Sequence, residues 1–176
     1  RTYKRSAAVS TLRRLAMHKW LFPIRTFKFV DGDTLDATVD MGLKIRADIR
    51  VRVPGIDCPE VRRLKTRKAG EAAKYAAELW MYRNGLANKY IWSKEMLADK
   101  YGRVMGDVIF IENHSNSLSS YLLKEGYART YEGGAKKEWA DEHLRHIERK
   151  AHNSFGIHID DGASYGTESE WADRIL

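Results

Sequence analysis

The sequence has a single cysteine, Cys58, and only three prolines, and both shortages limit what the chain can be. One thiol cannot form an internal disulfide, and it cannot supply the ligands of a cysteine-rich zinc site. A cysteine nucleophile would need a base and an orienting group, so we expect a passive side chain and give more weight to the Cys58 backbone carbonyl. Two of the prolines, Pro54 and Pro59, stiffen the loop around this cysteine.

Long hydrophobic runs are also missing. No stretch approaches the roughly 18 to 20 apolar residues of a bilayer-spanning helix, so we expect no transmembrane segment. Hydrophobic residues still make up 43% of the 176 residues, which is enough for a core, and the length fits one domain with appendages. We find no clear signal peptide, which favours an intracellular location.

Acidic residues are absent from the first 30 positions, whereas residues 1–28 carry eight basic ones. Leu12, Leu15 and Lys19 follow a helical period, so we expect residues 1–22 to form a basic helical arm. The arm could be a helix docked on the domain, a contact for nucleic acid, or the remnant of an organellar presequence. We favour the docked helix.

The other end of the chain has the opposite charge. Residues 160–176 are acidic without strong periodicity, and this tail either lies back on the basic body or is solvated. The net charge of +7 raises the local concentration of polyanions and modestly favours a nucleic-acid partner. Between arm and tail, we expect residues 23–159 to form a single folded domain.

Alternating hydrophobicity predicts a β-rich α+β fold. The clearest strand covers residues 45–53, with an apolar face and a polar face that carries Arg46, Arg50 and Arg52. Five strands interrupted by a helix suit a small closed barrel of the OB type, which often binds oligonucleotides. The other strands are expected at 27–30, 34–39, 89–94 and 103–111, and the three helices at 69 to about 84, 117–126 and 137–151, with residues 56–60 as a loop.

Charged residues at the predicted strand ends suggest a chemistry. Asp33 and Asp57 are short carboxylates that suit a hard divalent cation, and Glu60 could act on a water as a general base. Arg52 and Arg103 offer guanidinium groups that fit phosphate oxygens. Each residue alone is more often a turn residue or a solvated charge, but together they indicate metal-assisted phosphodiester hydrolysis.

These residues fall within a series of motifs in a fixed order. From about Phe27 to Ile157 the chain resembles the staphylococcal nuclease (thermonuclease) family. The resemblance implies a five-stranded OB-like barrel with three helices, and enzymes that cleave DNA and RNA with little sequence preference. The motifs are Asp31-Gly32-Asp33-Thr34, Arg52-Val-Pro-Gly-Ile-Asp57-Cys-Pro59-Glu60, Gly70-Glu71-Ala72, Lys100-Tyr101-Gly102-Arg103, Leu123-Lys-Glu-Gly126-Tyr-Ala128 and His143-Leu144-Arg145.

The resemblance also implies a metal site. Asp33 and Asp57 would hold one calcium ion through their carboxylates, although other divalent ions are possible. Cys58 would add its backbone carbonyl; many members carry threonine there, and a carbonyl ligand tolerates that change. Asp31 would not bind the metal ion itself but would help to orient the residues that do.

The catalytic roles follow in the same way. Glu60 would be the general base, or would at least order the attacking water. Arg52 and Arg103 would clamp the scissile phosphate and stabilise the charge of the transition state. Lys100, with Tyr101 or Tyr131, would contact the neighbouring nucleotide.

The nucleotide pocket is where this sequence departs from the family. Members use tyrosines shortly after the position of Ala128, but Glu132 and Gly134 stand there in this chain, with Tyr131 adjacent. The base preference or the product of the reaction can therefore differ from that of other members.

Three functional hypotheses result. The first is a calcium-dependent nuclease that acts on DNA or RNA. The second is a non-catalytic nucleic-acid-binding OB-fold module, as occurs when the metal and base positions have decayed. The intact Asp33, Arg52, Asp57, Glu60 and Arg103 favour the first. A third, an interaction protein that uses the arm or the tail, is compatible with it.

Overall fold

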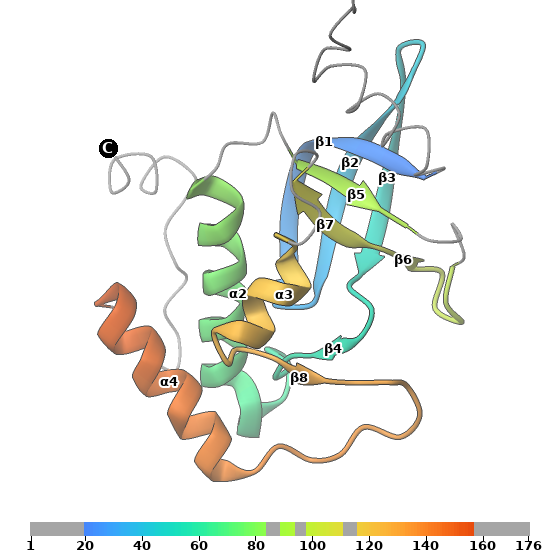
Figure 1. Cartoon of the computed structure of the whole chain (residues 1–176). Helices are drawn as coiled ribbons and strands as arrows, with labels where there is room; N and C mark the ends of the chain where they lie inside the picture. The colour runs from blue at the N-terminus through green and yellow to red at the C-terminus, as the bar shows by residue number, and fades with distance from the viewer. Residues whose placement is uncertain (1–19, 84–88, 94–97, 111–115, 157–176) are drawn as a thin grey trace, which may run out of the picture.

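The computed structural model describes residues 20–83, 89–93, 98–110 and 116–156 (Figure 1). The predicted acidic tail and nearly all of the basic arm lie outside these ranges. Strands β1 (Leu21–Asp31), β2 (Thr34–Gly42) and β3 (Ile45–Arg52) form an antiparallel meander. The register places Thr34 opposite Arg52, so the start of β2 and the end of β3 lie at the same end of the sheet.

The sheet is closed by one short segment of chain. Strand β5 (Lys89–Trp92) pairs with β1, and β7 (Asp107–Phe110) pairs with β5. Strand β6 (Val104–Met105) pairs in parallel with β3 at the other end of the order β6-β3-β2-β1-β5-β7. Since only Gly106 separates β6 from β7, residues 104–110 pair with both edges of the curled sheet. Counted as one bent strand, this segment completes the predicted OB-like barrel of five strands.

Gly106 allows this closure because it has no side chain. A Cβ there would lie 3.0 Å from Ile91 Cγ2 and 3.1 Å from the Trp92 carbonyl oxygen. The Gly106 N–H instead donates to the Arg52 carbonyl at 3.2 Å. The end of β3 is therefore fixed from two sides, by β2 and by the closing segment.

Within the described ranges, three α-helices accompany the barrel. They are α2 (Arg67–Arg83), which follows a short 3₁₀ turn η1 (Leu64–Thr66), then α3 (Leu118–Lys124) and α4 (Asp141–Phe155). Helix α2 packs on β1 and contacts both other helices (Figure 1). No helix in the described ranges is long and apolar enough to cross a membrane.

The prediction of a helical arm was wrong for its last two residues. Leu21 and Phe22 begin strand β1, where they pair with Trp92 and Ile91 of β5. The local pattern of apolar residues is helical, but pairing with a strand about 70 positions later overrides it.

The last predicted helix was misplaced. Residues 137–140 are not helical, and α4 instead begins at Asp141. The Arg129 guanidinium donates to the carbonyls of Lys137 and Glu138, which removes these groups from helical hydrogen bonding. Asn153 is not the stop either, because the helix continues to Phe155 and ends at Gly156, whose φ is 63°.

Two short strands lie near the end of β3. Strand β4 (Ile56–Asp57) lies in the expected loop and pairs antiparallel with β8 (Arg129–Thr130). The pairing brings Asp57 opposite Arg129, 72 positions apart.

Small residues let α2 approach the loop that carries Glu60. Ala69, Ala72 and Ala73 are fully buried. A Cβ on Gly70 would lie 2.9 Å from three backbone atoms: Glu60 C, Pro59 O and Val61 N. Helix and loop are therefore in contact through their backbones, so the position of Gly70 helps to set the position of Glu60.

The Gly70→Ala substitution should displace this loop. We expect a loss of about 1 to 3 kcal/mol in the free energy of unfolding, because the added methyl group meets backbone atoms and not a flexible side chain. Urea unfolding measures this loss, with Lys74→Ala on the same helix as the control. An unchanged midpoint for Gly70→Ala would show that the loop moves aside at no cost.

A buried lysine lies near two aromatic rings, Trp80 of helix α2 and Phe110 of strand β7. Lys89 is 0% exposed, its ammonium is 5.9 Å from the Trp80 ring centroid and 5.3 Å from that of Phe110, and it donates to the Met81 carbonyl at 2.5 Å. Burial lowers the pKa of Lys89 from 10.5 to about 8. The folded protein therefore holds this proton less tightly than the unfolded chain does.

This difference predicts a pH dependence of stability. Between pH 8 and 10.5 the unfolded chain binds more protons at Lys89 than the folded protein, so the contribution of this residue to the free energy of unfolding rises with pH. Urea unfolding across this interval should show wild type gaining stability relative to Lys89→Met. A difference between the two proteins that does not change with pH would contradict the burial of a charged lysine.

Candidate functional site

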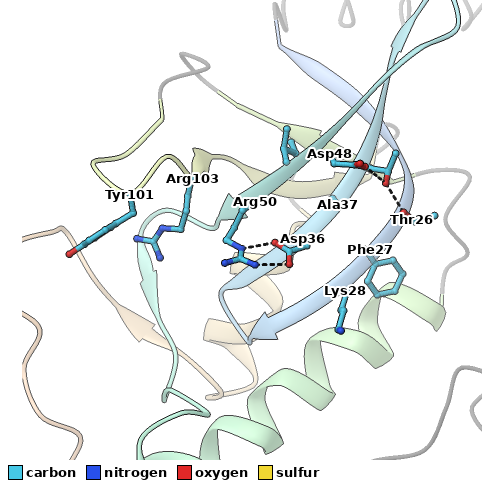
Figure 2. A pocket seen from close by; sticks show the side chains of 11 residues that line it. Thr26, Phe27, Lys28, Asp36, Ala37, Asp48, Arg50, Tyr101 and Arg103 are labelled. Atoms are coloured by element: carbon cyan, nitrogen blue, oxygen red, sulfur yellow. Dashed lines mark hydrogen bonds and ion pairs between the residues drawn. The ribbon is translucent and has the colours of Figure 1, made fainter.

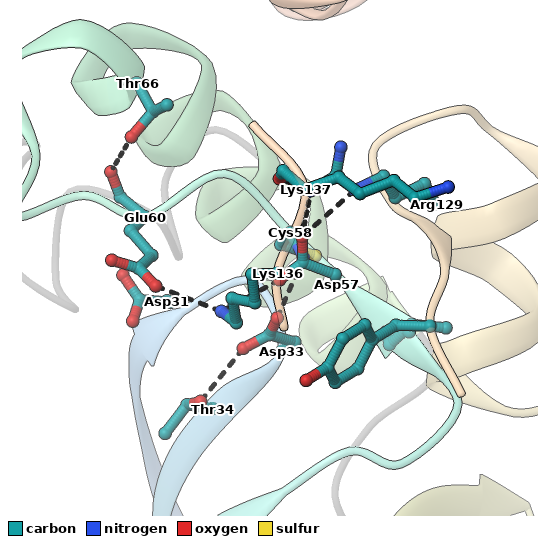
Figure 3. A network of polar contacts seen from close by, with 12 residues as sticks. Asp31, Asp33, Thr34, Asp57, Cys58, Glu60, Thr66, Arg129, Lys136 and Lys137 are labelled. Carbon is teal, nitrogen blue, oxygen red and sulfur yellow. Dashed lines mark hydrogen bonds and ion pairs between the residues drawn. The ribbon is translucent and has the colours of Figure 1, made fainter. Parts of the chain in front are cut away.

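Four segments meet at the end of the barrel where β3 stops. They are the β1–β2 turn with Asp31 and Asp33, the end of β3 with Arg52, the segment 57–60, and the loop after β8 (Figure 3). The structure thus brings together the predicted residues Asp31, Asp33, Arg52, Asp57, Cys58 and Glu60.

The first component is a buried ion pair. Arg52 Nη1 lies 2.9 Å from Asp33 Oδ2, and the two side chains are 7% and 5% exposed. Asp33 Oδ2 also accepts the Cys58 N–H at 2.8 Å, and Oδ1 accepts the Thr34 hydroxyl at 2.9 Å. Burial raises the pKa of Asp33, while Arg52 and these hydrogen bonds oppose the rise. The pair therefore ties the β1–β2 turn to the segment that contains Cys58.

Arg52 does not lie in the exposed row expected from the alternation. Arg46 and Arg50 are exposed, and Arg50 binds Asp36 through two hydrogen bonds of 2.6 and 2.8 Å (Figure 2). Arg52 is covered because the chain turns back over it after β3. Its guanidinium donates to the carbonyls of Asp33 at 3.2 Å, Val53 at 3.0 Å and Ile56 at 2.8 Å.

The second component is the carboxylate of Asp57, which is 1% exposed. Arg129 donates to Oδ2 from Nε at 3.1 Å and from Nη2 at 2.9 Å. The ammonium of Lys136 lies 2.8 Å from Oδ1. Both oxygens are thus balanced by positive charge from the segment after α3.

Glu60 completes the carboxylate cluster, by which we mean Asp33, Asp57 and Glu60. Its side chain is 32% exposed; Lys136 donates to Oε1 at 3.0 Å, and Arg63 Nε lies 2.7 Å from Oε2. Burial raises the pKa of Glu60, but the hydrogen bond from Lys136 and the charges of Lys136 and Arg63 bring it below its usual value. Glu60 is therefore ionised at neutral pH, as a general base must be.

Asp31 and Cys58, two further predicted site residues, lie at this loop. Asp31 Oδ1 accepts the Val61 N–H at 2.9 Å, which fixes the chain directly after Glu60. Cys58 is 1% exposed, and burial raises the pKa of its thiol well above the usual value. A protonated, buried thiol is a poor nucleophile, in agreement with the passive side chain expected for Cys58.

The cluster has the chemistry of a cation site. Carboxylate and carbonyl oxygens are the donors that hard divalent cations prefer, and a positive group, the Lys136 ammonium, already bridges Asp57 and Glu60. Within the described ranges, no three or more His, Cys, Asp or Glu side chains converge with the spacing of a metal site. The donor types therefore fit a cation, whereas the carboxylates do not converge as a preformed metal site, and the Lys136 ammonium bridges Asp57 and Glu60.

Arg103, Lys100 and Tyr101 lie beside a neighbouring groove. Arg103 Nε donates to Asp99 Oδ2 at 2.8 Å, and its guanidinium lies 5.2 Å from the Tyr101 ring. The Lys100 ammonium is 5.0 Å from the same ring. Tyr101 and Arg103 line a groove of about 500 Å³ together with Arg50 (Figure 2). The second predicted phosphate clamp is therefore paired with Asp99 in this structure.

Tyr131 is engaged within its own loop. Its N–H donates to the Gly55 carbonyl at 2.9 Å, and its hydroxyl donates to the Gly134 carbonyl at 2.6 Å. This tyrosine thus connects the loop after β8 to the segment between Arg52 and Asp57.

Sequence reasoning missed three cations that contact the carboxylate cluster. Arg63, Arg129 and Lys136 had no distinguishing pattern in the sequence. Lys136 lies 76 positions from Glu60, so no local periodicity could have revealed the contact.

Fold and site together define an OB-type barrel domain with a polar site where its strand ends meet. The chain belongs to the family described as Staphylococcal nuclease homologue, whose sequence model matches residues 50–155. This match confirms the resemblance seen in the motifs.

Two relatives carry the name "Probable endonuclease LCL3". One, from Nakaseomyces delphensis, is 32% identical over 94 residues, which cover 52% of this chain and 34% of that protein. The other, from Eremothecium gossypii, is 27% identical over 151 residues, which cover 84% of this chain and 52% of that protein. The chain therefore spans about half the length of these relatives or less.

The double contact of Arg129 with Asp57 should be important for stability. Removing one partner of a buried pair leaves an uncompensated charge, so Arg129→Met should cost about 3 kcal/mol in the free energy of unfolding. The added substitution Asp57→Asn should recover part of that loss, because the stranded charge is then gone. Urea unfolding of the four proteins of this double-mutant cycle measures the coupling, and additive losses would show that the pair contributes nothing.

Proposed function

We propose that the chain is a nuclease domain that hydrolyses phosphodiester bonds of DNA and/or RNA with little sequence specificity. The main observation behind this proposal is the position of the ionised Glu60 beside the buried Asp33–Arg52 pair and Asp57. Family membership and the names of the two relatives agree with a nuclease. A site of charges, without groups that read base edges, suits a reaction at the phosphate.

The metal ion of this reaction would be one calcium ion, although other divalent ions are compatible with the same donors. Asp33 and Asp57 would hold it through carboxylates and Cys58 through its carbonyl oxygen. A bound divalent ion would supply positive charge against the phosphate and would favour ionisation of a water.

The residues of the chain divide the remaining work. Glu60 would take a proton from the attacking water or orient it. Arg52, whose guanidinium is oriented by three carbonyls, would bind the phosphate through its remaining N–H groups. Arg103 would act from the neighbouring groove once a phosphate competes with Asp99 for it, and Lys100, Tyr101 and Tyr131 would contact the adjacent nucleotide.

Glu60→Gln and Arg103→Ala test this assignment. Each should lower the rate of plasmid cleavage in calcium by roughly 100-fold or more, as the loss of one contact made in the transition state does. Arg46→Ala, an exposed arginine on the same barrel, should cut at the wild-type rate, and chelator should abolish cutting. Circular dichroism checks that the variants are folded.

The alternative is a non-catalytic nucleic-acid-binding module. Binding of a fluorescent oligonucleotide by wild type, without cleavage under any divalent ion tried, would establish it. If cleavage occurs but both variants cut at the wild-type rate, the chain is a nuclease with a different catalytic set.

A further inference from the structure

Lys136 differs from Arg52 and Arg129, the arginines that contact the buried carboxylates Asp33 and Asp57. Arg52 is 6% exposed and is bound to three backbone carbonyls, and Arg129 is bound to the carbonyls of Lys137 and Glu138. Lys136 contacts two carboxylates, Asp57 at 2.8 Å and Glu60 at 3.0 Å, and its side chain is 37% exposed. It is therefore placed to leave the cluster without breaking the backbone contacts that hold the site.

The loop that carries Lys136 is fixed on both sides. Before it, the Tyr131 hydroxyl donates to the Gly134 carbonyl, and the glycine pair that follows β8 has φ angles of 98° and 84°. After it, Arg129 binds the two carbonyls and lies 4.1 Å from the ring centroid of Trp139. The backbone thus presents the lysine to the cluster, and only its flexible stem has to move for the ammonium to reach water.

The ammonium occupies an oxygen that the proposed divalent cation would need, Oδ1 of Asp57. It lies within ion-pair distance of Asp57 and Glu60 and faces Asp33, whose charge acts on it as well (Figure 3). A second positive group brought within a few ångströms would be repelled by it, and the interaction is strong where water is partly excluded. The ammonium and a metal ion therefore cannot both bind the Asp57 carboxylate at this oxygen.

We propose that Lys136 is a built-in competitor of the divalent cation, occupying the carboxylate cluster until the metal ion displaces it and thereby setting the affinity of the site. This inference rests on the proposed function for the identity of the cluster as a cation site. Lys136 acts through the carboxylates and does not touch the reacting atoms, so it is a positioning residue. Its side chain stabilises the metal-free form, and its release accompanies metal binding.

Calorimetric titration of calcium chloride into the full chain, without nucleic acid, tests the proposal. Lys136→Met removes the charge and keeps most of the volume, so its calcium Kd should fall by about tenfold or more. Lys137→Met changes the next lysine in the same loop and should leave the Kd at the wild-type value. Lys136→Arg keeps a competing charge and should bind calcium no more tightly than wild type.

Thermal unfolding gives a second readout that does not depend on cleavage. In chelator, Lys136→Met should melt below wild type because Asp57 and Glu60 lose their shared counter-charge. Saturating calcium should remove this difference, since the metal ion supplies the charge in both proteins. A deficit of the same size with and without calcium would show that Lys136 has a structural role only.

The outcomes separate this inference from the proposed function. An unchanged or weaker calcium affinity in Lys136→Met overturns the competition even if wild type is an active nuclease. If none of the proteins binds calcium, the competition is overturned as well. Cleavage by wild type in chelator that is lost in Lys136→Met would also overturn it, because the lysine would then replace the metal. A gain in calcium affinity with no cleavage by any protein would support the competition and refute the nuclease.

Discussion

The buried pair of Asp33 and Arg52 is the interaction on which the rest of the site depends. Two charges removed from water destabilise a fold unless nearly every donor and acceptor is satisfied, and here the partners come from separate segments. The Cys58 N–H and the Thr34 hydroxyl complete the carboxylate, and three carbonyls complete the guanidinium. The geometry of the β1–β2 turn and of the chain from β3 to Cys58 is thus fixed by one set of contacts.

On the other side of the site, close steric contacts fix the geometry of the chain. A Cβ on Gly32 would lie 3.0 Å from Cys58 Sγ and 3.1 Å from Ala73 Cβ, and one on Gly70 would meet the backbone at Glu60. Helix α2 therefore presses the turn of Asp33 and the loop of Glu60 into place, with Cys58 filling the space between them. The Cys58 side chain therefore acts here through its small size, and not through thiol chemistry.

Local patterns predicted the barrel and the carboxylates because both are encoded over a few residues. Alternation marks the strands, and the motifs around Asp33 and Asp57 occupy short turns. The features that local patterns could not predict depend on pairing across the fold. Leu21 belongs to β1 because it pairs with Trp92. Residues 137–140 are not helical because Arg129 binds the carbonyls of Lys137 and Glu138. Lys136 reaches Glu60 across 76 positions by the same kind of contact.

The cations of the site balance the charges of its carboxylates. Each carboxylate of the cluster has a partner from the chain: Arg52 for Asp33, Arg129 and Lys136 for Asp57, and Lys136 with Arg63 for Glu60. Domains that fold only around a metal leave their ligands uncompensated in its absence. Here the protein neutralises its own carboxylates, so the proposed cation would not be needed for folding. Under the proposed competition, the cost of that arrangement would fall on metal affinity, since an incoming ion would have to replace a charge that is already in place.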